Sequence, residues 1–121
     1  GVEVFVCPRS LPGAHDVLYR NDGDENFADV TVWARLKHPS PGYGLGVVFG
    51  DADGDGWPDL FVANDSSPNF FYRNRGDGTF AEVALEAGVA FGDMGQAQAG
   101  MGLARGDFDG DTQMDMLVTN F

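Results

Sequence analysis

The sequence predicts an all-β protein made of antiparallel four-stranded blades of a β-propeller, about two blades in all, and three observations lead to this prediction. An aspartate-rich loop occurs twice, at Asp51–Asp59 and at Asp107–Asp115. Each loop runs into a short apolar segment, Leu60–Ala63 or Met116–Thr119, which has the length and composition of a buried strand. The similarity between the two copies extends over a period of about 50 residues, which is typical of propellers and solenoids.

One complete blade is predicted within residues 44–84. Its strands follow one another as four short apolar or alternating segments, at Gly46–Gly50, Leu60–Asn64, Phe70–Arg73 and Thr79–Val83. Asn74–Gly78 has the Asn and Gly content of a tight hairpin turn between the last two strands. Four antiparallel strands per repeat are the content of one propeller blade.

Two partial blades flank the complete one. Residues 1–31 are expected to supply the second, third and fourth strands of a blade, at Val2–Cys7, Val17–Arg20 and Asn26–Val30. Residues 100–121 are expected to supply the first and second strands of another blade. The whole of residues 1–121 thus forms one propeller segment with the strand order 2-3-4, 1-2-3-4, 1-2. Closed propellers have about four to eight blades, so we expect either further blades in a longer protein or association between copies.

Helical pattern is weak throughout the chain. Only Ala84–Ala90 resembles a helix, and Gly88 interrupts it. Six aromatic residues lie within the predicted strands and are expected to pack between blades: Tyr19, Phe27, Phe49, Phe61, Tyr72 and Phe80.

The two aspartate-rich loops are predicted to bind one metal ion each. Four carboxylates in nine residues would repel one another unless a cation lay between them. Calcium accepts six to eight oxygen ligands and suits such a loop better than magnesium, which keeps its waters. The expected ligands are four carboxylates and one backbone carbonyl per loop: Asp51, Asp53, Asp55, Asp59 and the Trp57 carbonyl, then Asp107, Asp109, Asp111, Asp115 and the Gln113 carbonyl.

These two calcium ions are expected to be structural, because the loop supplies the ligands and leaves no evident open position for chemistry. Gly54 and Gly110 occupy positions where a loop that wraps an ion needs a positive φ angle. The EF-hand is the competing explanation, since its loop begins in the same way. It requires a glutamate at position 12, where this chain has Val62 and Val118, and it requires flanking helices.

The composition disfavours several classes of partner. The net charge of −12 disfavours nucleic acids and anionic membranes. No segment is long and apolar enough to predict a membrane span. The single cysteine, Cys7, has no partner for an internal disulfide and is interpreted as a small residue at a strand end.

The chain resembles a known family at its most specific motifs. The pattern Gly-Asp-x-Asp-Gly-Asp-x-x-x-Asp, followed by Tyr-Arg-Asn-x-Gly-Asp-Gly-x-Phe at 72–80, resembles the FG-GAP/VCBS repeats that build calcium-binding β-propellers. Three further segments are similar to the subset related to cartilage acidic protein and ASPIC/UnbV proteins: Cys7–Ala14, Tyr43–Val48 and Val62–Asp65. Thr112 and the pair Gln113-Met114 depart from the repeat pattern, so the second loop is expected to be less rigid.

The resemblance implies a calcium-stabilised, secreted propeller segment that acts in binding, adhesion or assembly, without enzyme activity. It implies an extracellular or cell-surface location, with the periplasm as an alternative, and a protein or glycan as ligand. A self-assembling subunit of a ring or filament is a second reading. A third is the propeller part of a polysaccharide-acting enzyme, which would need an acid and a base from a set that no spacing links: Glu3, His15, His38, Glu82, Glu86 and Asp93.

The tripeptide Arg75-Gly76-Asp77 could suggest cell adhesion. Its counterpart in the first copy is Asp22-Gly23-Asp24, so the Gly-Asp pair is interpreted as part of the hairpin turn.

Overall fold

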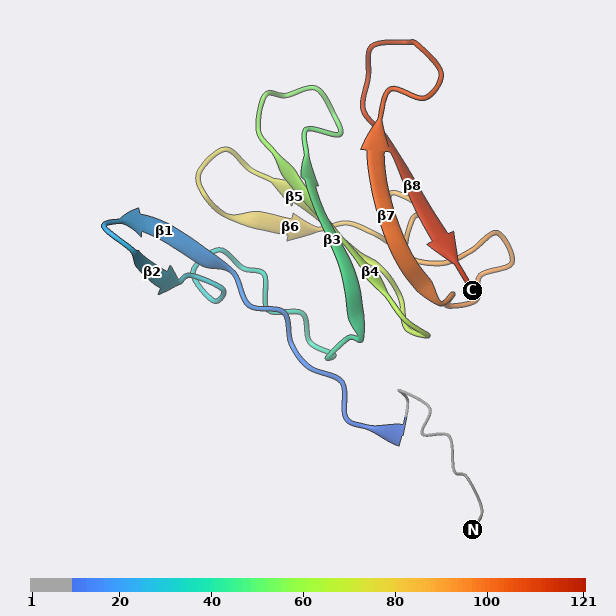
Figure 1. The fold of residues 1–121 in the computed structure, drawn as a ribbon, viewed down its shortest axis with the longest axis horizontal. Coiled ribbons are helices and arrows are strands. Elements are labelled where there is room, and N and C mark those ends of the chain that lie inside the picture. Colours follow the sequence, from blue (N-terminus) through green and yellow to red (C-terminus); the bar gives the residue numbers. More distant parts are fainter. Residues whose placement is uncertain (1–9) are drawn as a thin grey trace.

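The computed structural model describes residues 10–121, and within that range every regular element is a β-strand (Figure 1). The eight strands are β1 (Tyr19–Gly23), β2 (Asn26–Asp29), β3 (Gly44–Gly50), β4 (Asp59–Asn64), β5 (Phe70–Asn74), β6 (Phe80–Glu82), β7 (Gly100–Gly106) and β8 (Asp115–Asn120). They form three antiparallel sheets with the orders β1-β2, β3-β4-β5-β6 and β7-β8. The all-β, blade-like fold class predicted from the sequence is confirmed.

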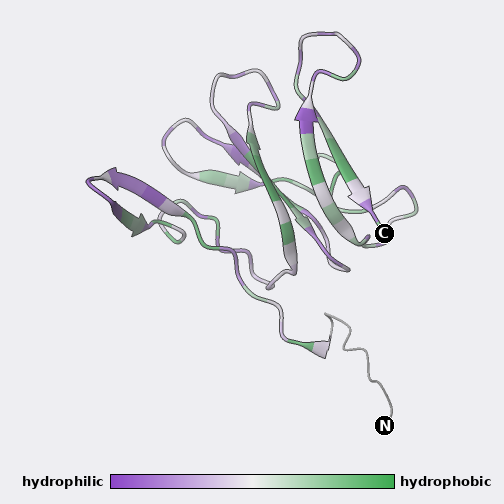
Figure 2. Ribbon diagram, in the orientation of Figure 1, coloured by the Kyte–Doolittle hydropathy of each residue, from purple (hydrophilic) through white to green (hydrophobic). Residues whose placement is uncertain are grey.

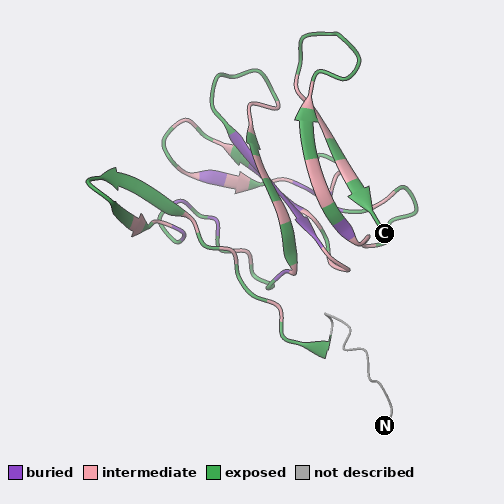
Figure 3. Ribbon diagram, in the orientation of Figure 1, coloured by how far each residue is buried: buried purple, intermediate pink, exposed green. Residues whose placement is uncertain are grey.

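The four-stranded sheet is organised around β4, in which every residue is buried (Figure 3). β4 pairs with β3 from Gly44↔Asn64 to Gly50↔Asp59 and with β5 through Leu60↔Tyr72. Its central position explains its unbroken apolar run, because alternation is needed only where one face of a strand meets water.

Two apolar clusters cover the two faces of this sheet. On one face, Leu60 and Val62 pack with residues of β5, β6 and the connection after β2: Ala34, Leu36, Phe70, Tyr72 and Phe80. On the other face, Phe61 and Ala63 pack with Phe71, Ala84 and Ala90. Side chains at successive positions of β4 therefore serve different clusters, as the pleat of a strand requires.

β7 and β8 cover the face that carries Phe61. Leu103, Met116 and Val118 pack against that cluster, and hydropathy alternates along β7 (Figure 2). Nη1 of Arg105 donates a hydrogen bond to the Phe49 carbonyl at 2.7 Å, which fixes β7 beside β3. The contact between two neighbouring blades is thus visible within the chain.

β1 and β2 form a hairpin that is largely exposed. Tyr19 is 60% exposed and Phe27 is 62% exposed, and Phe49 of β3 is 44% exposed. Of the six strand aromatics that were predicted to pack between blades, only Phe61, Tyr72 and Phe80 are buried. Phe61 shares a cluster with residues of β7 and β8, whereas Tyr72 and Phe80 pack with Ala34 and Leu36 of the connection after β2. Tyr19, Phe27 and Phe49 are exposed.

Connections differ from the sequence expectation in one place. The weakly helical segment 84–90 forms turns, with Gly88 at a φ of 75°, because that left-handed glycine ends the chain of helical hydrogen bonds. The predicted strand Val2–Cys7 lies outside the described residues. Across residues 10–121 there is also no helix with the length and hydropathy required to cross a membrane.

Candidate metal centres

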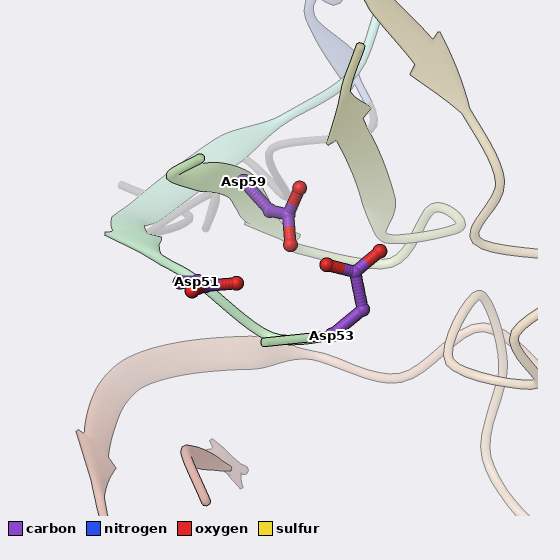
Figure 4. A group of neighbouring side chains, drawn as sticks. All are labelled: Asp51, Asp53 and Asp59. Carbon is purple, nitrogen blue, oxygen red and sulfur yellow. The ribbon is translucent and has the colours of Figure 1, made fainter. Parts of the chain in front are cut away.

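The first aspartate-rich loop connects β3 to β4 and brings three carboxylates together. Oxygen atoms of Asp51, Asp53 and Asp59 all lie within 4.8 Å of one another. Figure 4 shows the three side chains turned toward one shared space on one side of the loop. Because carboxylate oxygens are the ligands that calcium prefers, this donor set fits a hard divalent cation.

Asp51 organises the loop backbone. Its Oδ1 accepts hydrogen bonds from the amides of Gly54 at 2.8 Å and Asp55 at 3.1 Å, and its Oδ2 accepts one from Gly56 at 2.9 Å. Gly54 has a φ of 76°, as the sequence predicts, and Gly56 has a φ of 89°. The loop therefore curls around its own first carboxylate.

Asp59 joins the loop to the core of the sheet. It is 1% exposed, and its two oxygens accept hydrogen bonds from the amides of Ala52 at 3.0 Å and Asn74 at 2.8 Å. Asn74 is the last residue of β5, so one carboxylate closes the loop and holds the end of the third strand. Those two amides compensate the burial of its charge.

Asp53 is the exposed member of the group. Nε of Arg73 lies 3.7 Å from its Oδ2, so an arginine of β5 reaches the loop. Sequence reasoning did not include Arg73 or the Asn74 amide in the site. The repetition of Tyr-Arg-Asn at 19–21 and 72–74 was the available signal.

The second loop, between β7 and β8, repeats this arrangement. Oxygens of Asp107, Asp109 and Asp115 lie within 4.8 Å of one another. Asp107 accepts hydrogen bonds from the amides of Gly110 at 2.7 Å and Thr112 at 3.0 Å. Gly110 has the predicted positive φ, 84°.

Two differences distinguish the second loop from the first. Asp115 accepts one backbone hydrogen bond, from Phe108 to its Oδ2 at 2.8 Å, whereas Asp59 accepts two. Thr112 has a φ of 71° where the first loop has Gly56. A β-branched residue is strained in this left-handed region, so the second loop carries a local cost that the first does not.

The predicted ligands Asp55 and Asp111 lie outside these groups of three. Oδ1 of Asp55 accepts a hydrogen bond from the Trp57 amide at 2.8 Å, and Oδ1 of Asp111 accepts one from the Gln113 amide, also at 2.8 Å. The structure thus brings together three of the four predicted carboxylates in each loop. Metal binding by these residues, and by Asp55, Asp111 and the Trp57 and Gln113 carbonyls, stays a prediction.

The two loops lie side by side at one end of the sheets (Figure 1). A groove of about 360 Å³ separates them, lined by residues of both loops that include Asp51, Gly54, Asp107 and Gln113. Placing two such loops together concentrates negative charge at one end of the molecule, where cations would relieve the repulsion.

The carboxylate of Asp77 holds the β5–β6 turn. Oδ1 of Asp77 accepts hydrogen bonds from the amide and hydroxyl of Thr79 at 2.8 and 2.7 Å, and these bonds lower the pKa of Asp77. Adhesion through Arg75-Gly76-Asp77 would require the Asp77 carboxylate. That carboxylate is instead engaged in hydrogen bonds within its own hairpin.

Two of the residues considered for acid–base catalysis, Glu82 and His38, make structural contacts. Glu82 accepts hydrogen bonds from the amides of Phe71 and Ala84 at 3.2 and 2.8 Å. The ring of His38 stacks on Phe70 with centroids 4.2 Å apart. Glu3 lies outside the described residues. Among the others, no acid and base are hydrogen-bonded to each other within residues 10–121.

Comparison with known proteins agrees with this geometry. A family model described as FG-GAP-like repeat matches residues 2–62 and 51–118. Human cartilage acidic protein 1 is 38% identical over 78 residues, which cover 64% of this chain and 11% of that protein. The cartilage acidic protein 1 sequences of Xenopus tropicalis and Mus musculus are each 36% identical over 78 residues, covering 11% and 12% of their lengths.

Proposed function

Because the chain belongs to the FG-GAP-like repeat family, we propose that it is a calcium-stabilised segment of an extracellular β-propeller that serves binding or assembly and not catalysis. The observation that carries the proposal is the convergence of three carboxylates in each loop, Asp51, Asp53 and Asp59 and their counterparts Asp107, Asp109 and Asp115. The matched part spans only 11–12% of the cartilage acidic protein 1 sequences, so this chain corresponds to a small part of those longer proteins.

Each loop residue has a distinct part in the proposed centre. Asp51 shapes the loop through backbone amides, and Asp53 contributes an exposed carboxylate that a cation can reach. Asp59 anchors the cluster to β4 and β5. A bound calcium ion would neutralise the clustered charge and so couple metal binding to folding.

An extracellular location is supported by the similarity to cartilage acidic protein 1. Extracellular calcium modules bind with dissociation constants of about 0.1–1 mM, which suit such solvent-accessible sites. A protein or glycan ligand agrees better with the net charge of −12 than a nucleic acid does.

Calorimetric titration of the metal-stripped chain with calcium tests the proposal. We expect two sites in the wild type, one in Asp53→Asn, one in Asp109→Asn and none in the double variant. Asp24→Asn, in the β1–β2 turn, is the matched control and should retain two. Two sites remaining in the double variant would overturn the assignment of these loops.

A further inference from the structure

A pocket of about 220 Å³ lies at the end of the four-stranded sheet that is opposite to the first metal loop. That loop leads into β4 at Asp59, whereas the turn that carries Pro68 and Asn69 of the pocket lining follows the other end of β4 (Figure 1). The rest of the lining comes from β5, from the end of β6 and from the connections on both sides of the sheet. The pocket is therefore a feature of the complete blade, and it is separate from the metal centres.

Glu82, the last residue of β6, is held at this pocket by backbone amides. Its Oε1 accepts hydrogen bonds from the amide of Phe71 at 3.2 Å and from the amide of Ala84 at 2.8 Å. Within residues 10–121, Oε2 of Glu82 takes part in no hydrogen bond or ion pair. One oxygen thus fixes the carboxylate, and the other is free to accept a hydrogen bond from a ligand.

The first copy of the repeat satisfies the corresponding amide with different residues. The amide of Leu18, the counterpart of Phe71, donates to Oγ1 of Thr31 at 2.9 Å. That hydroxyl donates in turn to Oδ1 of Asp29 at 2.6 Å. In the second copy a longer acid reaches the amide directly, and Ala84 stands where the first copy has Thr31. The smaller side chain of Ala84 lines the pocket and leaves room beside the carboxylate.

The walls of the pocket are apolar and partly aromatic. The ring of His38 stacks on Phe70 with centroids 4.2 Å apart, and Leu85 and Phe91 are 74% and 39% exposed. The exposure of Leu85 belongs to this position of the repeat, because its counterpart Val32 is 76% exposed although the complete sheet follows it. Apolar walls around one hydrogen-bond acceptor suit a ligand with an apolar stem and a polar head.

The segment around the pocket favours a positively charged ligand. Residues 76–104 contain no lysine, arginine or histidine, and their acidic residues are Asp77, Glu82, Glu86 and Asp93. Because potentials of opposite sign attract across an interface, a cation is the complementary partner of this surface.

The volume of the pocket indicates what carries that charge. Sites for small organic molecules have volumes of about 300–1,000 Å³, and this pocket, at about 220 Å³, is smaller. A single side chain inserted from another protein suits the smaller volume. Arginine is among the residues that most often anchor protein interfaces in this way.

We propose that this pocket accepts an arginine side chain of a partner protein. The methylene stem lies against Leu85, and the planar guanidinium donates to Oε2 of Glu82 and stacks on the ring of Phe91. Lysine would supply the charge without the plane that stacks. The inference rests on the binding part of the proposed function and deepens it by naming the class of ligand.

Nuclear magnetic resonance titration of the isotope-labelled whole chain in calcium tests the proposal. The probe is the peptide acetyl-Gly-Arg-Gly-amide, and the matched control peptide carries citrulline, which has nearly the shape of arginine without its charge. We expect the arginine peptide to shift the amide signals of Phe71 and Ala84 saturably, with a dissociation constant of about 1–10 mM. The citrulline peptide should bind at least about tenfold more weakly, because hydrogen bonds between charged groups are the stronger ones.

A variant of the carboxylate assigns the binding to the pocket. Glu82→Gln keeps an acceptor for both amides and removes the charge, so it should weaken binding of the arginine peptide by about tenfold or more. Glu86→Gln is the matched control, since it makes the same change of charge outside the lining, and it should alter binding by less than about twofold.

A variant of the exposed wall tests the pocket without disturbing the fold. Leu85→Ser should weaken binding of the arginine peptide by about threefold or more, because it removes the surface against which the stem lies. Val32→Ser makes the same kind of change at the corresponding position of the first copy, which is outside the pocket, and should leave binding unchanged. Thermal unfolding in calcium should be the same for both variants and the wild type, since both side chains are exposed.

Absence of saturable shifts, equal binding of the two peptides, or unchanged binding by Glu82→Gln would overturn the assignment. Shifts of the same amide signals by N-acetylglucosamine at a lower concentration than the arginine peptide needs would overturn it in favour of a sugar site. A chain that binds two calcium ions but not the arginine peptide would refute this inference and leave the metal centres standing. Binding of the peptide by a chain that takes up no calcium would do the reverse.

Discussion

Asp59 serves the fold and the metal centre with the same carboxylate. It is almost fully buried, accepts amides from the loop and from β5, and lies within 4.8 Å of two other carboxylates. A hydrogen bond to a charged group contributes about 1.5–3 kcal/mol, and a buried donor that loses its acceptor costs a comparable amount.

Asp59→Ala should therefore destabilise the chain by about 3 kcal/mol even without metal. Asp115→Ala should cost about half as much, because Asp115 accepts one backbone amide in place of two. Urea unfolding in a chelator, at low protein concentration, measures both. Equal losses would show that the Asn74 amide contributes little.

Asp16 is expected to oppose folding at neutral pH. Burial raises its pKa, although the nearby His15 and His38 lower it. A carboxyl whose pKa is raised on folding holds its proton more tightly in the folded chain, so its contribution to stability is lost as pH rises through that pKa. Asp16→Asn should increase the free energy of unfolding near pH 7 and change it little at about pH 3.

Asp22→Asn is the control of opposite sign. The hydrogen bond from Arg20 lowers the pKa of Asp22, so its carboxylate favours folding above the unfolded pKa and this is lost as pH falls. Removing the Asp22 carboxylate should lower the free energy of unfolding slightly at neutral pH and leave it unchanged in acid. Urea unfolding across the pH range measures both variants, and a loss of stability for Asp16→Asn near pH 7 would contradict the expectation.

At the scale of elements, the two loops differ in backbone strain. Thr112 and Gly56 occupy the same loop position at φ angles of 71° and 89°. Thr112→Gly should stabilise the second loop by about 1 kcal/mol and tighten its calcium binding, and Gly56→Thr should weaken the first loop by a similar amount. Calorimetric titration with calcium measures this effect for one loop at a time, when an Asp→Asn change has removed metal binding by the other loop. No difference between the loops would mean that the strain is relieved elsewhere.

Strands and loops could be predicted because their determinants are local. The apolar run of β4 and the aspartates of each loop are read directly from neighbouring residues, and the predicted strand bounds differ from β3, β4 and β5 by only a few residues. The exposure of Tyr19 and Phe27 could not be predicted, because strand aromatics are buried only where a neighbouring sheet covers them. The groups of three carboxylates depend in the same way on where β4 returns beside the loop.

For the whole molecule, calcium should account for a large share of stability. A ligand at about 100 times its dissociation constant adds about 2.7 kcal/mol per site, so two sites add about 5 kcal/mol. Chelation should therefore lower Tm by more than about 10 °C for a chain of this size, and magnesium should restore little of the loss. Differential scanning calorimetry with calcium, chelator and magnesium measures this. Identical transitions would argue against a structural metal.

The positions of the two tryptophans give the chain an optical reporter of its own state. A Cβ atom at Gly76 would lie 2.9 Å from Nε1 of Trp57, and the ring of Trp33 lies as closely against Gly78, so both indoles touch the β5–β6 hairpin. Trp57 belongs to the first aspartate-rich loop, and Trp33 belongs to the connection after β2. Since the sequence contains only these two, fluorescence of Trp33→Phe follows the loop and that of Trp57→Phe follows the connection. Emission from one chain can thus separate a local event at the loop from loosening of the hairpin, without any attached dye.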